Sequence, residues 1–139
     1  MRLNTYLNFG GNCESAFRFY EQHLGGTITM LMRRAEQPGQ TETWPGWERS
    51  IQYASMNIGE TELMGADVAP DRFQPMRSVY LSLTVDSAEE AERIYALLSD
   101  GGQVFMPMEE TFFAVRFGML RDKFGTSWMI LALKPQPDV

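Results

Sequence analysis

The feature that most constrains this chain is an order of elements that occurs twice along it. A helix-like run that ends in Gly25–Gly26 leads into an extended stretch reaching Met30, and another that ends in Gly101–Gly102 leads into a stretch reaching Met106. When the runs are aligned with one inserted residue before the glycines, three pairs coincide: Ala16 with Ala91, Arg18 with Arg93 and Tyr20 with Tyr95. A recurring order of elements, here at a spacing of roughly 65–75 residues, indicates a duplicated structural unit.

Both runs carry the pattern of an amphipathic helix. The first has apolar residues at helical spacing, with Asn12 expected to cap its start and Gly25 to end it in the left-handed conformation. The second begins at Ser87, which forms a capping-box pattern with Glu90, and Gly101 follows its last turn. The two apolar stripes are Ala16, Phe19, Tyr20 and Leu24, and Ala91, Ile94, Tyr95 and Leu98.

A strand-like stretch precedes each helix, at residues 3–9 and 79–85, and both alternate between apolar and polar side chains. Such alternation is typical of a sheet with one face against helices and the other more polar. Residues 59–64 resemble residues 125–129 with one residue of slippage, so further strands follow each helix. We therefore predict an α+β fold of two tandem βαβββ modules, whose open, curved sheets surround a cavity.

Proline and glycine set the expected boundaries. Pro70 and Pro75 interrupt regular structure, so the first module is placed at residues 1–67, a linker at 68–78 and the second module at 79–139. An irregular stretch at residues 35–50 carries Trp44 and Trp47. Large indole side chains favour burial, so these two are expected to close a cavity, to contact a partner subunit, or to fold onto the core of their own module.

Composition restricts the class of partner. The apolar fraction is 44% and the charged fraction 22%, which is typical of a globular domain. The net charge is −6, which is unsuited to binding nucleic acid or an anionic membrane. The longest apolar run, residues 128–133, is too short to span a bilayer, and the N-terminal stretch lacks the apolar core of a signal peptide. The single cysteine, Cys13, excludes an internal disulfide. A cytoplasmic protein is expected.

Three stretches, at residues 6–26, 85–102 and 110–130, resemble the vicinal-oxygen-chelate superfamily, also described as the glyoxalase/bleomycin-resistance/dioxygenase fold, and within it the PhnB-like branch. The third stretch is the most specific because of its order ETFF, RFG, D-x-FG and WMI. The resemblance implies two modules that each form half of an open barrel, and a homodimer in which modules of two chains complete the barrels. Some members of this branch are labelled demethylubiquinone methyltransferase-like, but this chain has no glycine-rich turn of the nucleotide-binding kind.

Metal enzymes of the superfamily hold a divalent ion with one His, Glu or Gln from each of four strands. The resemblance carries these positions to Asn4 or Thr5, to Met64 with Glu62 two residues away, to Tyr80 and to Met129. Of these side chains only that of Glu62 is a good ligand for a hard metal, so we predict no catalytic metal and no cofactor. His23, the only histidine, is expected to have a structural role near the end of its helix.

Several other residues could take part in chemistry. Glu62 and Glu110 are the candidate catalytic carboxylates. Arg116 is expected either to pair with Glu110 or Asp122 or to hold an anionic ligand. Residues 122–125 are typical of a hairpin turn, and Cys13 opens a helix, where the dipole lowers the pKa of a thiol. The many methionines fit either an adaptable core or an apolar pocket.

The leading prediction is a homodimeric protein that binds a small molecule in a cavity lined by strands. The predicted ligand-binding residues are Asn4, Tyr6, Asn8, Met64, Tyr80, Ser82, Arg116, Met129, Trp44 and Trp47. The alternative is a lyase or isomerase of the glyoxalase type that uses a metal or a carboxylate such as Glu62 or Glu110. A third reading is an interaction domain whose cavity has filled in.

Overall fold

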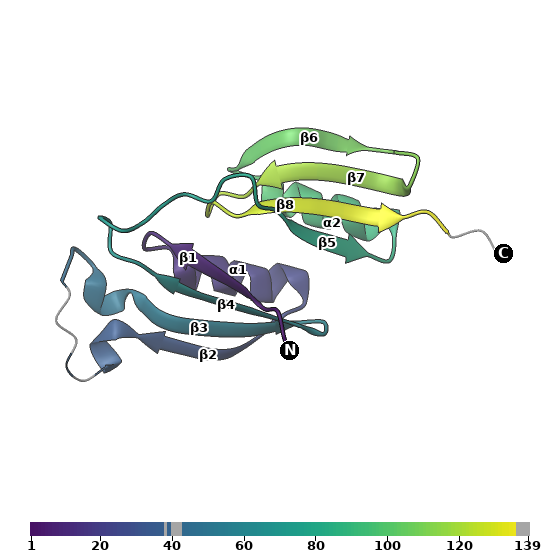
Figure 1. Ribbon diagram of the computed structural model, residues 1–139. Helices are drawn as coiled ribbons and strands as arrows, with labels where there is room; N and C mark the ends of the chain where they lie inside the picture. Colours follow the sequence, from purple (N-terminus) through teal and green to yellow (C-terminus); the bar gives the residue numbers. More distant parts are fainter. Residues whose placement is uncertain (38, 40–42, 136–139) are drawn as a thin grey trace. The chain divides into compact units, whose positions relative to one another are not determined.

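The computed structural model describes residues 1–37, 39 and 43–135 of the chain (Figure 1). The chain divides into two compact units, Met1–Pro75 and Met76–Val139, and the division lies within the stretch 68–78 that was expected to be a linker. No helix of the described residues combines the length and the apolar character needed to cross a bilayer.

The first unit is a four-stranded sheet with one α-helix. The sheet order is β1-β4-β3-β2, in which β1 runs parallel to β4 and the other neighbours are antiparallel. Two short 3₁₀ helices, η1 and η2, lie between β2 and β3. The elements are β1 (Thr5–Phe9), α1 (Cys13–Leu24), β2 (Thr27–Arg33), η1 (Arg34–Glu36), η2 (Trp47–Arg49), β3 (Ile51–Ile58) and β4 (Thr61–Asp67).

The second unit repeats this arrangement. Its sheet order is β5-β8-β7-β6, again with the first strand parallel to the last and with antiparallel neighbours elsewhere. The elements are β5 (Leu81–Val85), α2 (Ala88–Ser99), β6 (Gln103–Glu109), β7 (Ala114–Arg121) and β8 (Ser127–Leu133). The predicted α+β fold of two βαβββ modules is confirmed.

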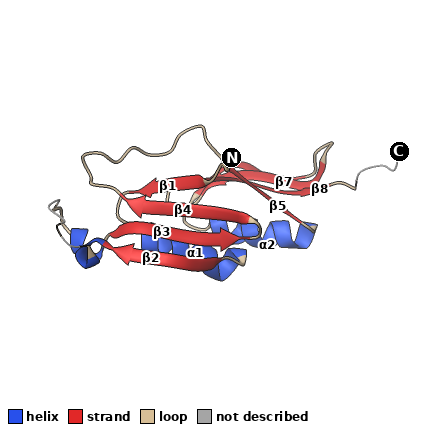
Figure 2. Ribbon diagram, turned by 60° about the horizontal axis from the view of Figure 1, so that its bottom comes forward, coloured by secondary structure: helices blue, strands red, loops and turns tan. Residues whose placement is uncertain are grey.

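Each helix covers one face of the sheet in its own unit, as Figure 2 shows. In the first unit, a Cβ added to Gly65 of β4 would lie 2.9 Å from the ring of Phe17, so Gly65 faces α1. In the second, a Cβ added to Gly118 of β7 would lie 2.6 Å from the ring of Tyr95, so Gly118 faces α2. The core between helix and sheet includes Leu7, Phe9, Phe17, Tyr20 and Met56 in the first unit, and Ala91, Ile94, Leu98, Leu120 and Ile130 in the second. The opposite side of each sheet is called its open face below.

The duplicated glycine pair has the same role in both units. Gly25 and Gly101 follow their helices with φ of 72° and 74°, which only glycine adopts without strain. The second glycine of each pair allows a close approach: a Cβ on Gly26 would lie 2.7 Å from the Met56 sulfur, and a Cβ on Gly102 would lie 2.2 Å from the Arg121 carbonyl oxygen. The first glycine therefore ends the helix, and the second lets the next strand pass its neighbour.

The two helices are capped differently. The Ser87 side chain accepts a hydrogen bond from the Glu90 backbone N–H at 3.1 Å, as the capping box predicts. The expectation for Asn12 is wrong, because its side chain makes no capping bond to α1. The carboxylate of Asp67, at the end of β4, instead accepts hydrogen bonds from the backbone N–H groups of Gly11 and Cys13, both at 3.0 Å.

The first strand of each module begins later than predicted. Leu3 and Val79 were expected on the apolar faces of their strands, but β1 starts at Thr5 and β5 at Leu81. The two side chains are 98% and 62% exposed. The apolar–polar alternation extends two residues before the start of each strand, so the pattern overestimated the length of both strands.

Candidate functional site

Predicted site residues of the first unit lie together on its open face. Because side chains alternate along a strand, Glu62, Met64 and Ala66 point away from α1 when Gly65 points toward it. The sheet register pairs Tyr6 and Ser55 with Met64 and pairs Asn8 with Ala66, so Tyr6 and Asn8 share this face. Asn4 lies one residue before β1.

Hydrogen-bonding groups dominate this open face. Tyr6 is 48% exposed, and its ring centroid lies 6.5 Å from that of Tyr53. Partial burial, with smaller effects of Cys13 and Tyr53, raises the pKa of the Tyr6 phenol. Its hydroxyl therefore stays protonated at neutral pH and can both donate and accept.

Glu62 is the one predicted catalytic carboxylate that lies on this face. It accepts a hydrogen bond from the Ser55 hydroxyl at 2.8 Å, and its second oxygen lies 3.6 Å from the Arg2 guanidinium. Its side chain is 26% exposed. The carboxylate is thus held within the sheet surface by a neighbouring strand.

The open face of the second unit is apolar. Met106, Met119 and Met129 are paired across β6, β7 and β8, and they pack against a buried cluster of Ala114, Phe117 and Leu131. Ser82 of β5 pairs with Met129, so this predicted pair is also brought together. Tyr80 lies one residue before β5, and its ring contacts that of Phe105 edge-on at 6.2 Å.

Arg116 and Glu110 do not join these residues. The Arg116 guanidinium lies 2.9 Å from the Glu92 carboxylate of α2, on the helix side of the sheet. The expected pairing with Glu110 or Asp122 is therefore wrong. Glu110 follows β6, and its 64% exposed side chain lies 3.9 Å from the Lys134 ammonium.

Asp122 has the turn role that the sequence predicts. One carboxylate oxygen accepts hydrogen bonds from the backbone N–H groups of Phe124 and Thr126, at 2.9 and 3.0 Å. The other accepts from the Trp128 indole N–H at 2.9 Å. Gly125 completes the turn with φ of 99°.

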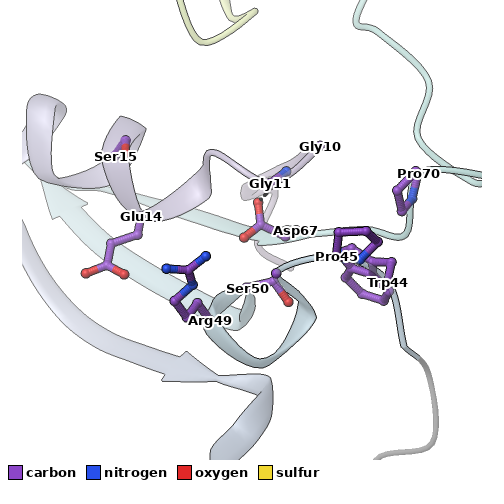
Figure 3. Close-up of a pocket in the computed structure, with 11 residues that line it drawn as sticks. Gly10, Gly11, Glu14, Ser15, Trp44, Pro45, Arg49, Ser50, Asp67 and Pro70 are labelled. Atoms are coloured by element: carbon purple, nitrogen blue, oxygen red, sulfur yellow. Dashed lines mark hydrogen bonds between the residues drawn. The ribbon is translucent and has the colours of Figure 1, made fainter.

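A pocket of about 370 Å³ lies at the edge of the first unit (Figure 3). It is formed by the β1–α1 turn, the first turn of α1, the segment around η2 and the end of β4. In the view of Figure 3, Glu14 and Ser15 stand on one side, Trp44, Pro45 and Pro70 on the other, and Arg49 between them. The lining residues are Gly10, Gly11, Glu14, Ser15, Trp44, Pro45, Gly46, Arg49, Ser50, Asp67 and Pro70.

Of the predicted site residues, only Trp44 lines this pocket. Trp47 is half-buried in η2, and part of the predicted irregular stretch, at residues 38 and 40–42, lies outside the described residues. The sequence held two indications of the pocket, the paired Gly10–Gly11 before a helix and the tryptophans beside a proline. Neither pattern shows that the glycine turn and the tryptophan segment lie next to each other in the fold.

Asp67 lines the pocket and has a structural role there. Besides its bonds to Gly11 and Cys13, it accepts the Ile51 backbone N–H at 2.8 Å and is 1% exposed. Arg34 is also buried, and it donates to the Ile51 carbonyl at 2.7 Å and to the Ser50 hydroxyl at 3.3 Å. The Arg34 guanidinium stacks 5.1 Å from the centroid of the Trp44 ring, which holds this tryptophan at the pocket wall.

Cys13 does not have the environment of a reactive thiol. It is fully buried, and burial raises the pKa of its thiol, with smaller contributions from Asp67 and Glu14. The expected lowering by the helix dipole is outweighed, because a thiolate would be desolvated beside a carboxylate. The observed role of Cys13 is in the core, and its backbone N–H is held by Asp67.

Comparison with known proteins decides the family. The family model described as 3-demethylubiquinone-9 3-methyltransferase matches residues 1–131. The chain belongs to this family. It is 32% identical to Protein YjdN from Escherichia coli (strain K12) over 99% of both chains.

Two solved structures are similar over nearly the whole chain. Protein PA1353 from Pseudomonas aeruginosa is 38% identical with a TM-score of 0.86, covering 95% of this chain and 97% of that one. A PhnB protein from Bacillus cereus is 27% identical with a TM-score of 0.80, covering 95% of this chain and 99% of that one. The predicted PhnB-like membership is thereby confirmed. A glyoxylase/bleomycin resistance protein/dioxygenase domain from Frankia sp. EAN1pec, 15% identical over 98% of both chains with a TM-score of 0.64, shows the shared vicinal-oxygen-chelate fold.

The side chains that we expect at the metal positions of the superfamily's enzymes do not fit a hard divalent ion. Asn4, Met64, Tyr80 and Met129 supply a weak amide, two soft thioethers and a phenol at these predicted positions. Glu62, the good ligand, is engaged by Ser55 and Arg2. Within residues 1–37, 39 and 43–135, no group of three or more His, Cys, Asp or Glu side chains is arranged to hold an ion.

Proposed function

We propose that this PhnB-like protein binds a small organic molecule on the open face of its first sheet and does so without a catalytic metal. The observation that supports this most is the sheet register, which sets Tyr6, Ser55 and Met64 side by side on the face that α1 leaves uncovered. The Tyr6 hydroxyl and the Asn8 amide lie beside Met64 on this face, and Glu62 next to them is held by Ser55 and Arg2.

The side chains define the chemistry of the ligand. The Tyr6 hydroxyl and the Asn8 amide each offer donors and acceptors, whereas Met64 offers a polarizable apolar surface. A neutral molecule with one or two polar groups on an apolar body matches this set. In the second unit the methionine cluster Met106, Met119 and Met129 provides an apolar open face of its own, suited to the apolar body of a ligand.

Substitution on the open face tests the proposal. We expect Asn8→Ala and Tyr6→Leu each to weaken binding of such compounds roughly three- to tenfold, the worth of one hydrogen bond. The probes are neutral aromatic and aliphatic fragments bearing one amide or hydroxyl group, and affinity is measured by amide chemical-shift titration. The matched control is Gln22→Ala, an exposed amide on α1.

The proposal requires that titration move the backbone amide signals of Tyr6, Ser55 and Met64. It would be refuted if the fragments left these signals in place, or if Asn8→Ala and Gln22→Ala had equal affinities. A lyase or isomerase acting through Glu62 would instead show turnover that Glu62→Gln abolishes, while Asn8→Ala only raises KM.

We also propose that the protein is a homodimer. Large apolar side chains of the second unit are exposed in the single chain, with Phe112 at 92% and Leu133 at 50%. Large apolar side chains exposed to this degree favour an interaction site. Light scattering coupled to gel filtration is expected to give twice the mass of the 15.9 kDa chain, and a monomer at micromolar concentration would contradict this.

A further inference from the structure

We propose that the pocket beside the β1–α1 turn is a second binding site, specific for a small monocarboxylate with a flat, apolar body. It shares no lining residue with the open-face positions Tyr6, Asn8, Ser55, Glu62 and Met64. The inference therefore goes beyond the proposed function. Its volume of about 370 Å³ is at the small end of the range of roughly 300–1,000 Å³ that ligand pockets occupy.

Arg49 supplies the group that selects an anion. It lines the pocket, is exposed, and has no ion-pair partner or side-chain hydrogen bond among the described residues. A guanidinium offers a planar fork of donors that matches a carboxylate in a bidentate arrangement. An unpaired arginine at the centre of a pocket is thus prepared for a negatively charged group.

The carboxylates at the pocket do not cancel this charge. Glu14 accepts hydrogen bonds from Arg18 at 3.0 Å and from Arg33 at 2.7 and 2.8 Å, so two guanidinium groups balance it. The Asp67 carboxylate accepts hydrogen bonds from three backbone N–H groups, which engage both of its oxygens. Among the described residues, Arg49 is thus the one charged side chain of the pocket lining that has no such partner. A single guanidinium fork matches one carboxylate.

The opposite side of the pocket selects the rest of the ligand. Trp44, Pro45 and Pro70 form its apolar wall (Figure 3). The Trp44 ring is held by the Arg34 guanidinium, so it offers a fixed surface on which a flat group can stack at little entropic cost. A ligand whose carboxylate binds Arg49 and whose ring stacks on Trp44 would contact both sides of the pocket.

The test is an amide chemical-shift titration of the full chain with phenylacetate and benzoate, each beside its neutral amide, phenylacetamide and benzamide. We expect the carboxylates to move the Gly10, Gly11, Ser15 and Gly46 signals and to bind at least tenfold more tightly than the amides. Arg49→Gln should remove this preference, and Arg49→Lys should restore part of it. Arg77→Gln, which removes an equal exposed charge outside the pocket, should change nothing.

Stacking is tested in the same way. Trp44→Leu should weaken carboxylate binding several-fold, whereas Trp47→Leu, in the same segment but outside the pocket lining, should not. Equal affinities of acids and amides, equal affinities of Arg49→Gln and the unsubstituted protein, or no saturable shift at these four amides would each overturn the proposal. Shifts confined to Tyr6, Ser55 and Met64 would also overturn it while supporting the open-face site.

Discussion

Asp67→Asn is expected to lower the free energy of unfolding by about 3 kcal/mol. The carboxylate is fully buried and accepts three backbone N–H groups, from Gly11, Cys13 and Ile51, at 2.8–3.0 Å. These bonds join the start of α1 and the start of β3 to the end of β4. An amide has one acceptor oxygen, and its NH₂ group would face N–H donors, so at least one buried N–H would be left without a partner.

Urea unfolding followed by circular dichroism measures this effect. The matched control is Asp71→Asn, which alters an exposed carboxylate of the same unit and should change stability by less than about 0.5 kcal/mol. The expected difference in stability between the two variants is due to the hydrogen bonds that the buried Asp67 carboxylate accepts. Equal midpoints for the two would show that Asp67 does not join these segments in solution.

Gly102→Ala is expected to destabilise the second unit by about 2–3 kcal/mol. The added Cβ would lie 2.2 Å from the Arg121 carbonyl oxygen and 3.1 Å from the Asp122 Cα. Both atoms belong to the backbone of the β7–β8 hairpin, which cannot move aside without disturbing the turn that Asp122 stabilises. Overpacking of this kind costs about 1–3 kcal/mol when the neighbour must shift.

Gly26→Ala is the matched variant in the first unit. Its new Cβ would meet the sulfur of Met56 at 2.7 Å, and a methionine side chain can change rotamer. We therefore expect a smaller loss of stability than for Gly102→Ala in the same urea titration. A larger loss for Gly26→Ala would mean that the two glycine pairs are not placed as described.

The parts of the fold that sequence could predict are those set by neighbours along the chain. The helices follow from apolar spacing, their ends from Gly25 and Gly101, and the cap of α2 from Ser87 three residues before Glu90. Alternation also placed Tyr6 and Asn8 opposite Leu7 and Phe9, because a strand turns each successive side chain to the other face. The exposed Leu3 and Val79 show the limit, since alternation alone does not say where a strand ends.

The remaining features depend on partners far apart in sequence. Asp67 replaces Asn12 as the cap of α1 across more than fifty residues, because the parallel pairing of β1 with β4 brings its carboxylate to the turn. Arg116 pairs with Glu92 because it lies two residues before Gly118 in β7, on the face of the sheet that α2 covers. The pocket at Arg49 arises where four such segments meet, so no local pattern predicts it.

The most direct test of metal-free binding on the open face is a crystal structure of the protein grown with a neutral fragment that binds and with Zn²⁺, Ni²⁺ or Mn²⁺ present. We expect density for the fragment against Tyr6, Asn8 and Met64, and no ion there. A cation held by Asn4, Glu62 or Tyr80, or a fragment found only on the helix side of the sheet, would contradict it.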